Sequence, residues 1–244
     1  MIATRTTGQI WLTSKVLATF DENRRQVAER YLCGEGIEIG ALHLPLEVGP
    51  DARVRYVDRC DEQTLRGQYP ELADMDLAPV DVVDDGEVLA TFAPESLDFI
   101  IANHFLEHCE NPLGTLRVHL SRLMPGGVIY AALPDKRFTF DRSRPLTPFE
   151  HLAADDRDGP EGSRAAHYLE VASLQLELAD QDAERKAAEM ADAAYSIHFH
   201  VWDAAAYLEF LARARSYLAE AFEVAHFQRN GVENIAILKK PDED

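Results

Sequence analysis

Short apolar runs rich in β-branched residues recur along this chain and are separated by stretches that can form helices. Such runs suit strands that are buried on both faces, and the helical spacers suit the crossovers that parallel strands require. The runs lie at 37–39, 54–57, 80–83, 99–102, 128–133, 222–227 and 235–238. This alternation predicts an α/β fold: a Rossmann-like seven-stranded sheet, mostly parallel, with helices on both faces.

The two ends of the chain add one helix and one hairpin to this prediction. Residues 230–233 read Asn-Gly-Val-Glu, which is too short for a parallel crossover, so the last two runs must form a C-terminal antiparallel hairpin. Near the other end, 21–32 carries a helical pattern, with Asp21 as a candidate cap and Val27 and Tyr31 on one face. We therefore expect residues 1–33 to be an N-terminal helical cover.

The turn after the first run points to a nucleoside ligand. Gly40 stands where a ligand can approach the backbone, and Asp58 ends the second run, where a carboxylate can accept hydrogen bonds from both ribose hydroxyls. A dinucleotide fingerprint would place three glycines at this turn, and Gly40 stands alone. A nicotinamide-dependent enzyme is therefore an alternative that the missing glycines argue against.

Several motifs follow one another in a characteristic order. They are Glu38-Ile39-Gly40-Ala41-Leu42, Asp58, Asp84-Asp85, the stretch Leu97-Asp98-Phe99-Ile100-Ile101-Ala102-Asn103-His104-Phe105-Leu106-Glu107-His108, and the turn Leu123-Met124-Pro125-Gly126-Gly127. With the terminal hairpin, this order resembles the class I S-adenosylmethionine-dependent methyltransferases, and the match covers roughly 35–135. The resemblance implies S-adenosylmethionine as the cofactor and methyl transfer as the reaction.

The resemblance also implies roles for individual residues. Glu38 and Gly40, with Ala41 and Leu42, would meet the methionine half of the cofactor, and Asp58 would meet the ribose. Either Asp84 or Asp85 would meet the adenine amino group. In an open parallel sheet the ligand lies beyond the carboxyl ends of the strands. We therefore expect one crevice to be formed by the residues that follow these ends, namely Gly40, Asp58, Asp84, Asp85, Asn103, His104 and Asp135.

Methyl transfer to a hydroxyl oxygen benefits from a general base, and histidine is the natural candidate. His104 directly follows Asn103 at the strand end and is the first choice, and His108 comes four residues later. Further candidates for catalysis or for lining the acceptor pocket lie beyond the fifth strand, at Asp135, His151, His167, His198 and His200.

Residues 197–202 alternate in character, so an extended segment would place His198 and His200 on one side. Two histidines at this spacing could hold a metal with Asp135 or Glu150. Because no third ligand lies nearby in the sequence, we assign no metal ligands.

The segment 134–197 is too long for an ordinary connection, which predicts a lid or substrate-binding insertion within a single methyltransferase domain spanning 1–244. Within it we expect a mobile loop at 155–163 and a helix over 173–194, the latter either a solvated cover or a contact in a homodimer. Asp203 should cap a helix from 204 to about 218. Four cations could bind an acceptor carboxylate or phosphate, or form surface salt bridges: Lys136, Arg137, Arg142 and Arg144.

Composition narrows the partners and the compartment. The net charge is −19, from 43 acidic and 24 basic side chains, which disfavours nucleic acid and anionic membranes. Cys33, Cys60 and Cys109 form no CxxC motif, and the sequence shows no signal peptide or transmembrane run, so we expect a cytoplasmic protein. The predicted acceptor is a small molecule, with a sugar or secondary-metabolite hydroxyl as the guess from the resemblance. The alternative is a methyltransferase-like binding module that acts through a partner without turnover.

Overall fold

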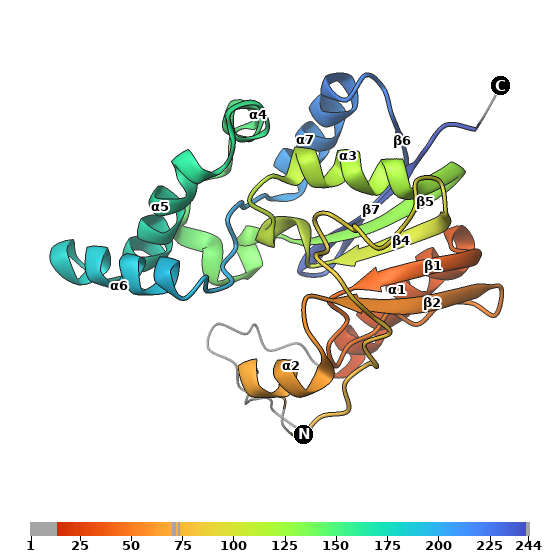
Figure 1. Ribbon diagram of the computed structural model, residues 1–244, viewed down its shortest axis with the longest axis horizontal. Helices are drawn as coiled ribbons and strands as arrows, with labels where there is room; N and C mark the ends of the chain where they lie inside the picture. The colour runs from red at the N-terminus through yellow and green to blue at the C-terminus, as the bar shows by residue number, and fades with distance from the viewer. Residues whose placement is uncertain (1–13, 70–71, 73, 243–244) are drawn as a thin grey trace.

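A seven-stranded sheet forms the centre of the computed structural model, which describes residues 14–69, 72 and 74–242 (Figure 1). The strand order is β3-β2-β1-β4-β5-β7-β6, and every pair is parallel except those of β7 with β5 and with β6. This confirms the predicted fold class, including the terminal hairpin. The strands are β1 (Gly34–Ile39), β2 (Ala52–Asp58), β3 (Val82–Val83), β4 (Leu97–Asn103), β5 (Leu123–Pro134), β6 (Glu223–Asn230) and β7 (Glu233–Lys239).

The central strands of the sheet are buried on both faces, as alternation along β5 shows. Ile129 and Leu133 belong to a core with α3 (Pro112–Arg122) and α7 (Ala204–Tyr217), whereas Val128 and Tyr130 belong to a second core with α1 (Ser14–Tyr31). In Figure 1, α3 and α7 lie on one side of the sheet and α1 on the other. Strand side chains alternate between faces, so β5 must be apolar throughout.

The predicted helical cover is present in its described part. α1 packs Val27, Ala28 and Leu32 into the second core, but it begins at Ser14, so Asp21 lies inside the helix and does not cap it. The prediction that Asp21 is a cap was therefore wrong, because a helix-capping residue type also occurs on solvated helix faces. The rest of the expected cover, residues 1–13, lies outside the described residues.

Shorter elements connect the strands and position the polar residues discussed below. Asp61 caps α2 (Glu62–Gln68) by accepting a hydrogen bond from the Thr64 amide. The 3₁₀ turn η2 (Leu106–His108) follows β4 directly. Among the described residues, no helix is both long and apolar enough to cross a bilayer.

Between β5 and α7 the chain forms a helical insertion. It contains η3 (Lys136–Phe138), η4 (Phe140–Ser143), α4 (Phe149–Asp158), α5 (Glu161–Glu170), the π-helical turn η5 (Val171–Gln175) and α6 (Asp180–Asp192). The prediction of a mobile loop at 155–163 was wrong, because two helices meet there and only Gly159, with φ of +92°, and Pro160 separate them. The single helix predicted over 173–194 is divided in two, with Glu177 in a left-handed conformation between the parts.

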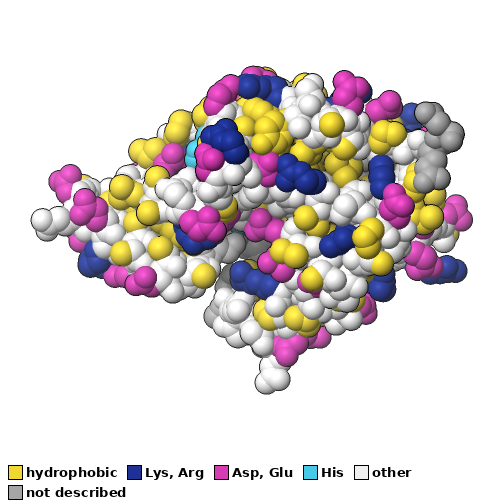
Figure 2. All heavy atoms as spheres, turned by 45° about the horizontal axis from the view of Figure 1, so that its top comes forward, with side chains coloured by type: hydrophobic (Ala, Val, Ile, Leu, Met, Phe, Trp, Pro, Cys, Tyr) yellow, Lys and Arg dark blue, Asp and Glu magenta, His cyan; other side chains and the backbone are white. Residues whose placement is uncertain are grey.

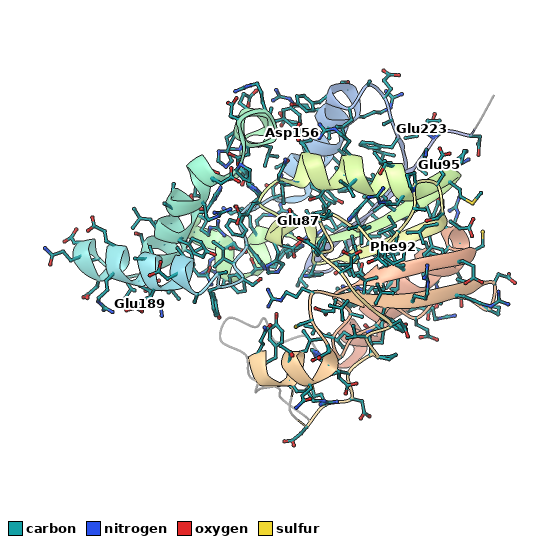
Figure 3. All side chains as sticks on the ribbon, in the orientation of Figure 1. Glu87, Phe92, Glu95, Asp156, Glu189 and Glu223 are labelled. Carbon is teal, nitrogen blue, oxygen red and sulfur yellow. The ribbon has the colours of Figure 1, made fainter. Side chains whose placement is uncertain are left out.

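The insertion has a core of its own and is attached to the sheet layer by several contacts, among them those of Asp156. Tyr168, Met190 and Phe199 are members of that separate core. Asp156 of α4 accepts hydrogen bonds from Arg117 of α3 and from Asn111, which caps α3. Asp156 is labelled in Figure 3. Figure 1 shows α5 and α6 projecting away from the sheet.

Candidate functional site

The glycine turn after β1 has the geometry of a ligand cradle. Gly40 adopts φ of +66°, and a Cβ built there would meet no atom within 4 Å, so the backbone faces open space. Neighbouring Ala41 and Leu42 are half-buried, and Leu42 also has a positive φ of 48°. The turn therefore allows a close approach to its backbone, which is what glycine provides at such positions.

Beneath this turn lies a buried carboxylate. Glu38 is 1% exposed and accepts hydrogen bonds from the Leu46 amide at 3.0 and 3.1 Å. Burial raises its pKa to about 7. Asn103, at the end of β4, donates from Nδ2 to Glu38 at 3.5 Å, while its buried Oδ1 has no hydrogen-bond partner among the described residues. The unpartnered Asn103 oxygen, next to the Glu38 carboxyl, suits a ligand that brings a cationic or N–H group, so these residues fit the ammonium end of S-adenosylmethionine.

Three aspartates follow β2 and β3, where the sequence placed them. Asp58 accepts a hydrogen bond from the Arg59 amide, and burial raises its pKa. Asp84 uses both oxygens to close its own loop, accepting from the Asp85 and Thr91 amides, whereas Asp85 accepts only from the Glu87 amide and remains exposed. Asp85 is thus the freer of the two carboxylates.

At the end of β4, His104 forms a pair with a carboxylate from β7. Its Nε2 lies 2.8 Å from Oε2 of Glu233, and His104 adopts a left-handed backbone with φ of 48°. Glu233 is fully buried and also accepts from Arg24 of α1 at 2.5 and 2.8 Å and from Asn230 at 2.8 Å. Although burial opposes ionisation, these hydrogen bonds and charges lower the pKa of Glu233 to about 2, so it is a carboxylate at neutral pH.

Beside His104 lies a buried cluster formed by Glu107, His108 and His198. One ligand-type atom from each lies within 4.8 Å of the others. Both Glu107 oxygens lack hydrogen-bond partners among the described residues, and burial raises its pKa to about 7. His108 Nδ1 donates to the Ile197 carbonyl at 2.9 Å, and His198 Nδ1 lies 2.6 Å from Asp141. Burial lowers the pKa of His108 to about 3, so its ring is neutral.

Asp135 and three of the four predicted cations are engaged in internal contacts. Asp135 is buried and accepts from the Arg137 amide and guanidinium, which anchors η3. Arg144 is buried between Asp141 and Glu170, and the Lys136 ammonium donates to the Arg142 and Arg144 carbonyls. The catalytic role predicted for Asp135 stays a prediction, and the geometry gives this residue a structural role.

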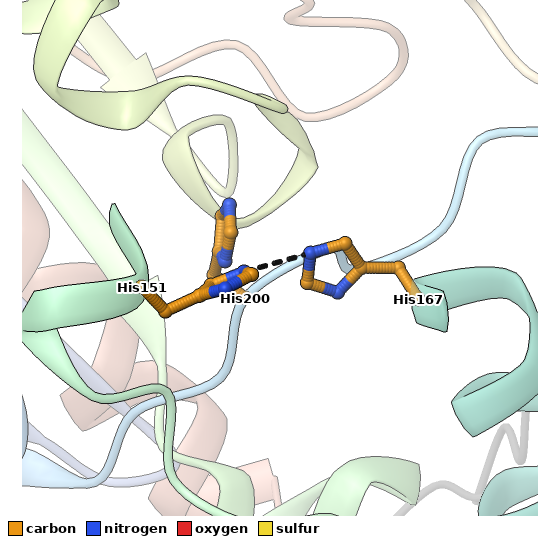
Figure 4. Close-up of side chains that lie close together, drawn as sticks. All are labelled: His151, His167 and His200. Atoms are coloured by element: carbon orange, nitrogen blue, oxygen red, sulfur yellow. Dashed lines mark hydrogen bonds between the residues drawn. The ribbon is translucent and has the colours of Figure 1, made fainter. Parts of the chain in front are cut away.

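His198 and His200 belong to different clusters, because 197–201 is irregular rather than extended. His200 is buried with His151 of α4 and His167 of α5, and one ring nitrogen from each lies within 4.8 Å of the others (Figure 4). The expectation that His198 and His200 share one side was therefore wrong. Nor do Asp135 and Glu150 complete a site with them, since Asp135 pairs with Arg137 and Glu150 with Arg213.

Several important residues were not predicted from the sequence. Glu233, Arg24, Glu107 and Asp141 surround His104 and His198; Glu107 stands in the motif after the fourth strand but was assigned no role, and the other three stand in no motif. Their roles depend on contacts such as Arg24–Glu233, which joins the first described helix to the last strand. Only the arrangement of buried charges in three dimensions identifies them.

Comparison with known proteins identifies the family and the fold. A family profile described as a methyltransferase domain matches residues 33–215. No curated protein shows significant similarity. Among solved structures, a candidate methyltransferase from Bacillus halodurans has 13% identity, covers 94% of this chain and 100% of its own, and superposes with a TM-score of 0.50. A SAM-dependent methyltransferase from Aquifex aeolicus (11% identity, 94% and 98% coverage, TM-score 0.48) and another from Methanosarcina mazei (14%, 96% and 100%, 0.46) are also similar.

The family match covers most of the chain, including the glycine turn, the acidic strand ends and the histidine after β4. The strand order with its reversed β7 provides independent agreement. The chain therefore belongs to the methyltransferase-domain family and is a class I S-adenosylmethionine-dependent methyltransferase.

Proposed function

We propose that the enzyme transfers a methyl group to a hydroxyl oxygen of a small molecule, with His104 as the general base. The observation that carries this proposal is the hydrogen bond between His104 Nε2 and Glu233. Because Glu233 is ionised and can only accept, Nε2 carries the proton and Nδ1 carries the lone pair. The nearest carboxylate oxygen to Nδ1, Oε1 of Glu107, is 3.6 Å away, beyond hydrogen-bond distance, which leaves the lone pair for a substrate proton.

Glu233 would act as a positioning residue for this base. It holds one tautomer of His104 and stabilises the imidazolium that forms when Nδ1 takes the hydroxyl proton, as carboxylates do beside catalytic histidines in other enzymes. Arg24 keeps Glu233 charged and in place. His104 is the exposed member of this chain of contacts, with 39% of its side chain accessible, so an acceptor can reach it.

The cofactor would be held at the ends of β1 to β4. S-adenosylmethionine supplies the activated methyl group, so the protein has chiefly to align the acceptor and exclude water. Gly40, Ala41 and Leu42 would line its methionine half with Glu38 and Asn103 as acceptors, and Asp58 would accept from the ribose hydroxyls. Asp85 would meet the adenine amino group, because both oxygens of Asp84 are used within its own loop.

The insertion would cover the acceptor and set its size. His108 and His198 would line the acceptor pocket next to His104, with Glu107 as a third polar wall. Arg142 borders a cavity of about 280 Å³ together with Phe138 and Phe140, which suits an acceptor bearing a carboxylate or phosphate. The net charge of −19 favours a small molecule over nucleic acid, and the three free thiols, Cys33, Cys60 and Cys109, fit a reducing cytoplasm.

Calorimetric titration tests the cofactor assignment first. Purified protein should bind S-adenosylmethionine and S-adenosylhomocysteine but not NAD, and Asp58→Ala should weaken both by about 1.5 to 3 kcal/mol if its carboxylate accepts from ribose. Unchanged affinity in this variant would remove Asp58 from the site. Binding of NAD alone would overturn the cofactor assignment.

The base is tested with hydroxyl-bearing small molecules, sugars included, by following S-adenosylhomocysteine formation. His104→Gln should lower kcat by about 10²- to 10⁴-fold while leaving the dissociation constant for the cofactor unchanged. Loss of cofactor affinity with normal turnover at saturation would contradict the base assignment. Tight cofactor binding without turnover of any acceptor would favour the non-catalytic binding module.

A further inference from the structure

Three histidines from separate parts of the insertion converge at one point outside the crevice described above. His151 lies on α4, His167 on α5 and His200 in the segment before α7. Nε2 of His151 and Nε2 of His167 are 3.0 Å apart, and Figure 4 shows the three rings meeting. We propose that these three residues, called the histidine triad below, bind a divalent transition-metal ion, with Zn²⁺ as the best match.

The hydrogen bonding of His200 leaves one nitrogen ready to ligate. Its Nε2 lies 3.2 Å from the Glu110 carbonyl, which can only accept, so Nε2 carries the proton and Nδ1 carries the lone pair. Nδ1 is buried and has no hydrogen-bond partner among the described residues. Metal-bound histidines typically donate their other ring N–H to a carbonyl or carboxylate in this way.

A carboxylate next to the triad supplies negative charge. Asp155 follows His151 by one helical turn on α4, and its Oδ2 lies 3.2 Å from His151 Nε2. Asp155 is 5% exposed, and this Oδ2 also has no hydrogen-bond partner among the described residues. Two unpartnered buried acceptors facing two neighbouring imidazoles cost free energy unless a cation joins them. Asp155 therefore supplies negative charge beside His151, although it is not part of the group of three ring nitrogens that lie within 4.8 Å of one another.

The donor set selects the metal. Three imidazole nitrogens with a fourth position left for water form a known tetrahedral zinc environment, whereas Mg²⁺ and Ca²⁺ prefer oxygen ligands. Zinc-bound nitrogens at about 2.0–2.1 Å from the ion stand roughly 3.4 Å apart. The separation of 3.0 Å between His151 and His167 is close to that value.

The site is accessible and would join distant parts of the chain. His151 and His167 border a cavity of about 210 Å³, together with Glu170 and Phe199, which provides a path for an ion. The ion would tie α4 to α5 and to the segment that returns to α7, and the His200–Glu110 hydrogen bond extends this tie to the loop after β4. The expected role is to fix the insertion, and it does not depend on the acceptor or on the base.

Metal titration of the full chain tests the proposal. After dialysis against a chelator, wild-type protein should bind one equivalent of Zn²⁺ in competition with a chromophoric chelator, and Co²⁺ should give a tetrahedral visible spectrum. His151→Gln and His167→Gln should each weaken Zn²⁺ binding by more than about 100-fold, since losing an outer-shell partner alone costs about 10- to 100-fold. Asp155→Asn should weaken it by at least about tenfold.

Two control variants locate the site. His226→Gln alters a half-buried histidine of β6, and His108→Gln alters the other histidine cluster, and neither should change Zn²⁺ affinity. Circular dichroism of the metal-free variants establishes that they fold. Zn²⁺ at 100 times its dissociation constant should raise the melting temperature of the wild type by about 5 to 10 °C and of the triad variants far less.

Two results would overturn the proposal. One is wild-type protein that binds no Zn²⁺ and gives no tetrahedral Co²⁺ spectrum. The other is a folded His151→Gln/His167→Gln double variant that keeps wild-type Zn²⁺ affinity, or a His108→Gln variant that loses it.

Discussion

At the scale of single residues, two buried carboxyl groups near His104 have opposite pKa shifts because their surroundings differ. Glu233 accepts hydrogen bonds from cationic and amide donors, and its pKa falls to about 2. Glu107 is buried with no donor to either oxygen among the described residues and lies near other carboxylates, and its pKa rises to about 7. Both side chains are almost fully buried. His104 therefore has an ionised carboxylate, Glu233, beside Nε2 and a carboxyl group that titrates near neutral pH, Glu107, on the side of Nδ1.

Acid should therefore destabilise the enzyme through Glu233. Its folded pKa is depressed, so its contribution is present above the unfolded value of 4.5 and is lost as the pH falls towards 2. Between pH 5 and 3 the wild type should lose on the order of 1 to 2 kcal/mol more unfolding free energy than Glu233→Gln. Urea titrations at both pH values measure this difference, and parallel losses in the two proteins would contradict the ionised pair.

Glu107 should act in the opposite direction. Because its folded pKa is raised, the native state holds a proton that the unfolded chain has released, and stability falls as the pH rises through about 7. From pH 6 to 8 the wild type should lose about 1 kcal/mol more than Glu107→Gln. Glu189→Gln, an exposed change on α6 (Figure 3), is the control and should leave the wild-type slope unchanged.

Residue positions could be predicted where the residues stand in an ordered motif and not elsewhere. Gly40, Asp58 and His104 stand at the ends of strands that can be recognised from the apolar residues just before them. The sequence was therefore sufficient to place these residues at strand ends. Glu233 and the histidine triad could not be predicted, because their partners are far away in sequence and become neighbours only when β7 and the insertion are in place.

At the scale of elements, the sequence predicted a helix start or a turn correctly where the deciding hydrogen bond is made to a residue only a few positions away. Asp203 accepts a hydrogen bond from the Ala206 amide and begins α7, as the sequence predicted. The short connection at 230–233 likewise forms the predicted hairpin. The polar stretch 155–163 was misread, because tertiary contacts such as Asp156 with Arg117 hold helices whose local composition resembles a loop.

The cap on α7 gives a direct test at this scale. Asp203→Ala should lower stability by about 1 kcal/mol, which corresponds to a melting temperature about 2 to 4 °C lower for a domain of this size. Asp203→Asn keeps an equally good capping group and should melt close to the wild type. Differential scanning calorimetry measures both, and a large loss in the asparagine variant would assign the effect to charge rather than to capping.

At the scale of the whole molecule, the chain carries a large net negative charge. Figure 2 shows acidic and basic side chains interspersed on the face that it displays, and acids exceed bases by 19 over the chain. Such a field attracts cations over distances up to the Debye length, which is about 10 Å at 0.1 M salt. S-adenosylmethionine carries a net positive charge and S-adenosylhomocysteine none, so the field distinguishes substrate cofactor from product.

Salt should therefore affect the two nucleosides differently. Raising the salt concentration from 20 to about 300 mM should slow the association of S-adenosylmethionine severalfold, by less than about tenfold, and leave that of S-adenosylhomocysteine nearly unchanged. Stopped-flow fluorescence measures both rates. Equal salt dependence for the two ligands would show that steering by net charge plays no part.

The place of β7 between β5 and β6 has a consequence for how the enzyme is made. β7 is synthesised after the other strands of this sheet, yet it lies between two of them and carries the carboxylate that contacts His104. While a nascent chain still lacks β7, β6 has no partner strand in the sheet, and Arg24 has no Glu233 to meet. We therefore expect the proposed cofactor site, which uses the ends of β1 to β4, to form before the His104–Glu233 contact, which requires β7, so that binding competence precedes catalytic competence during translation.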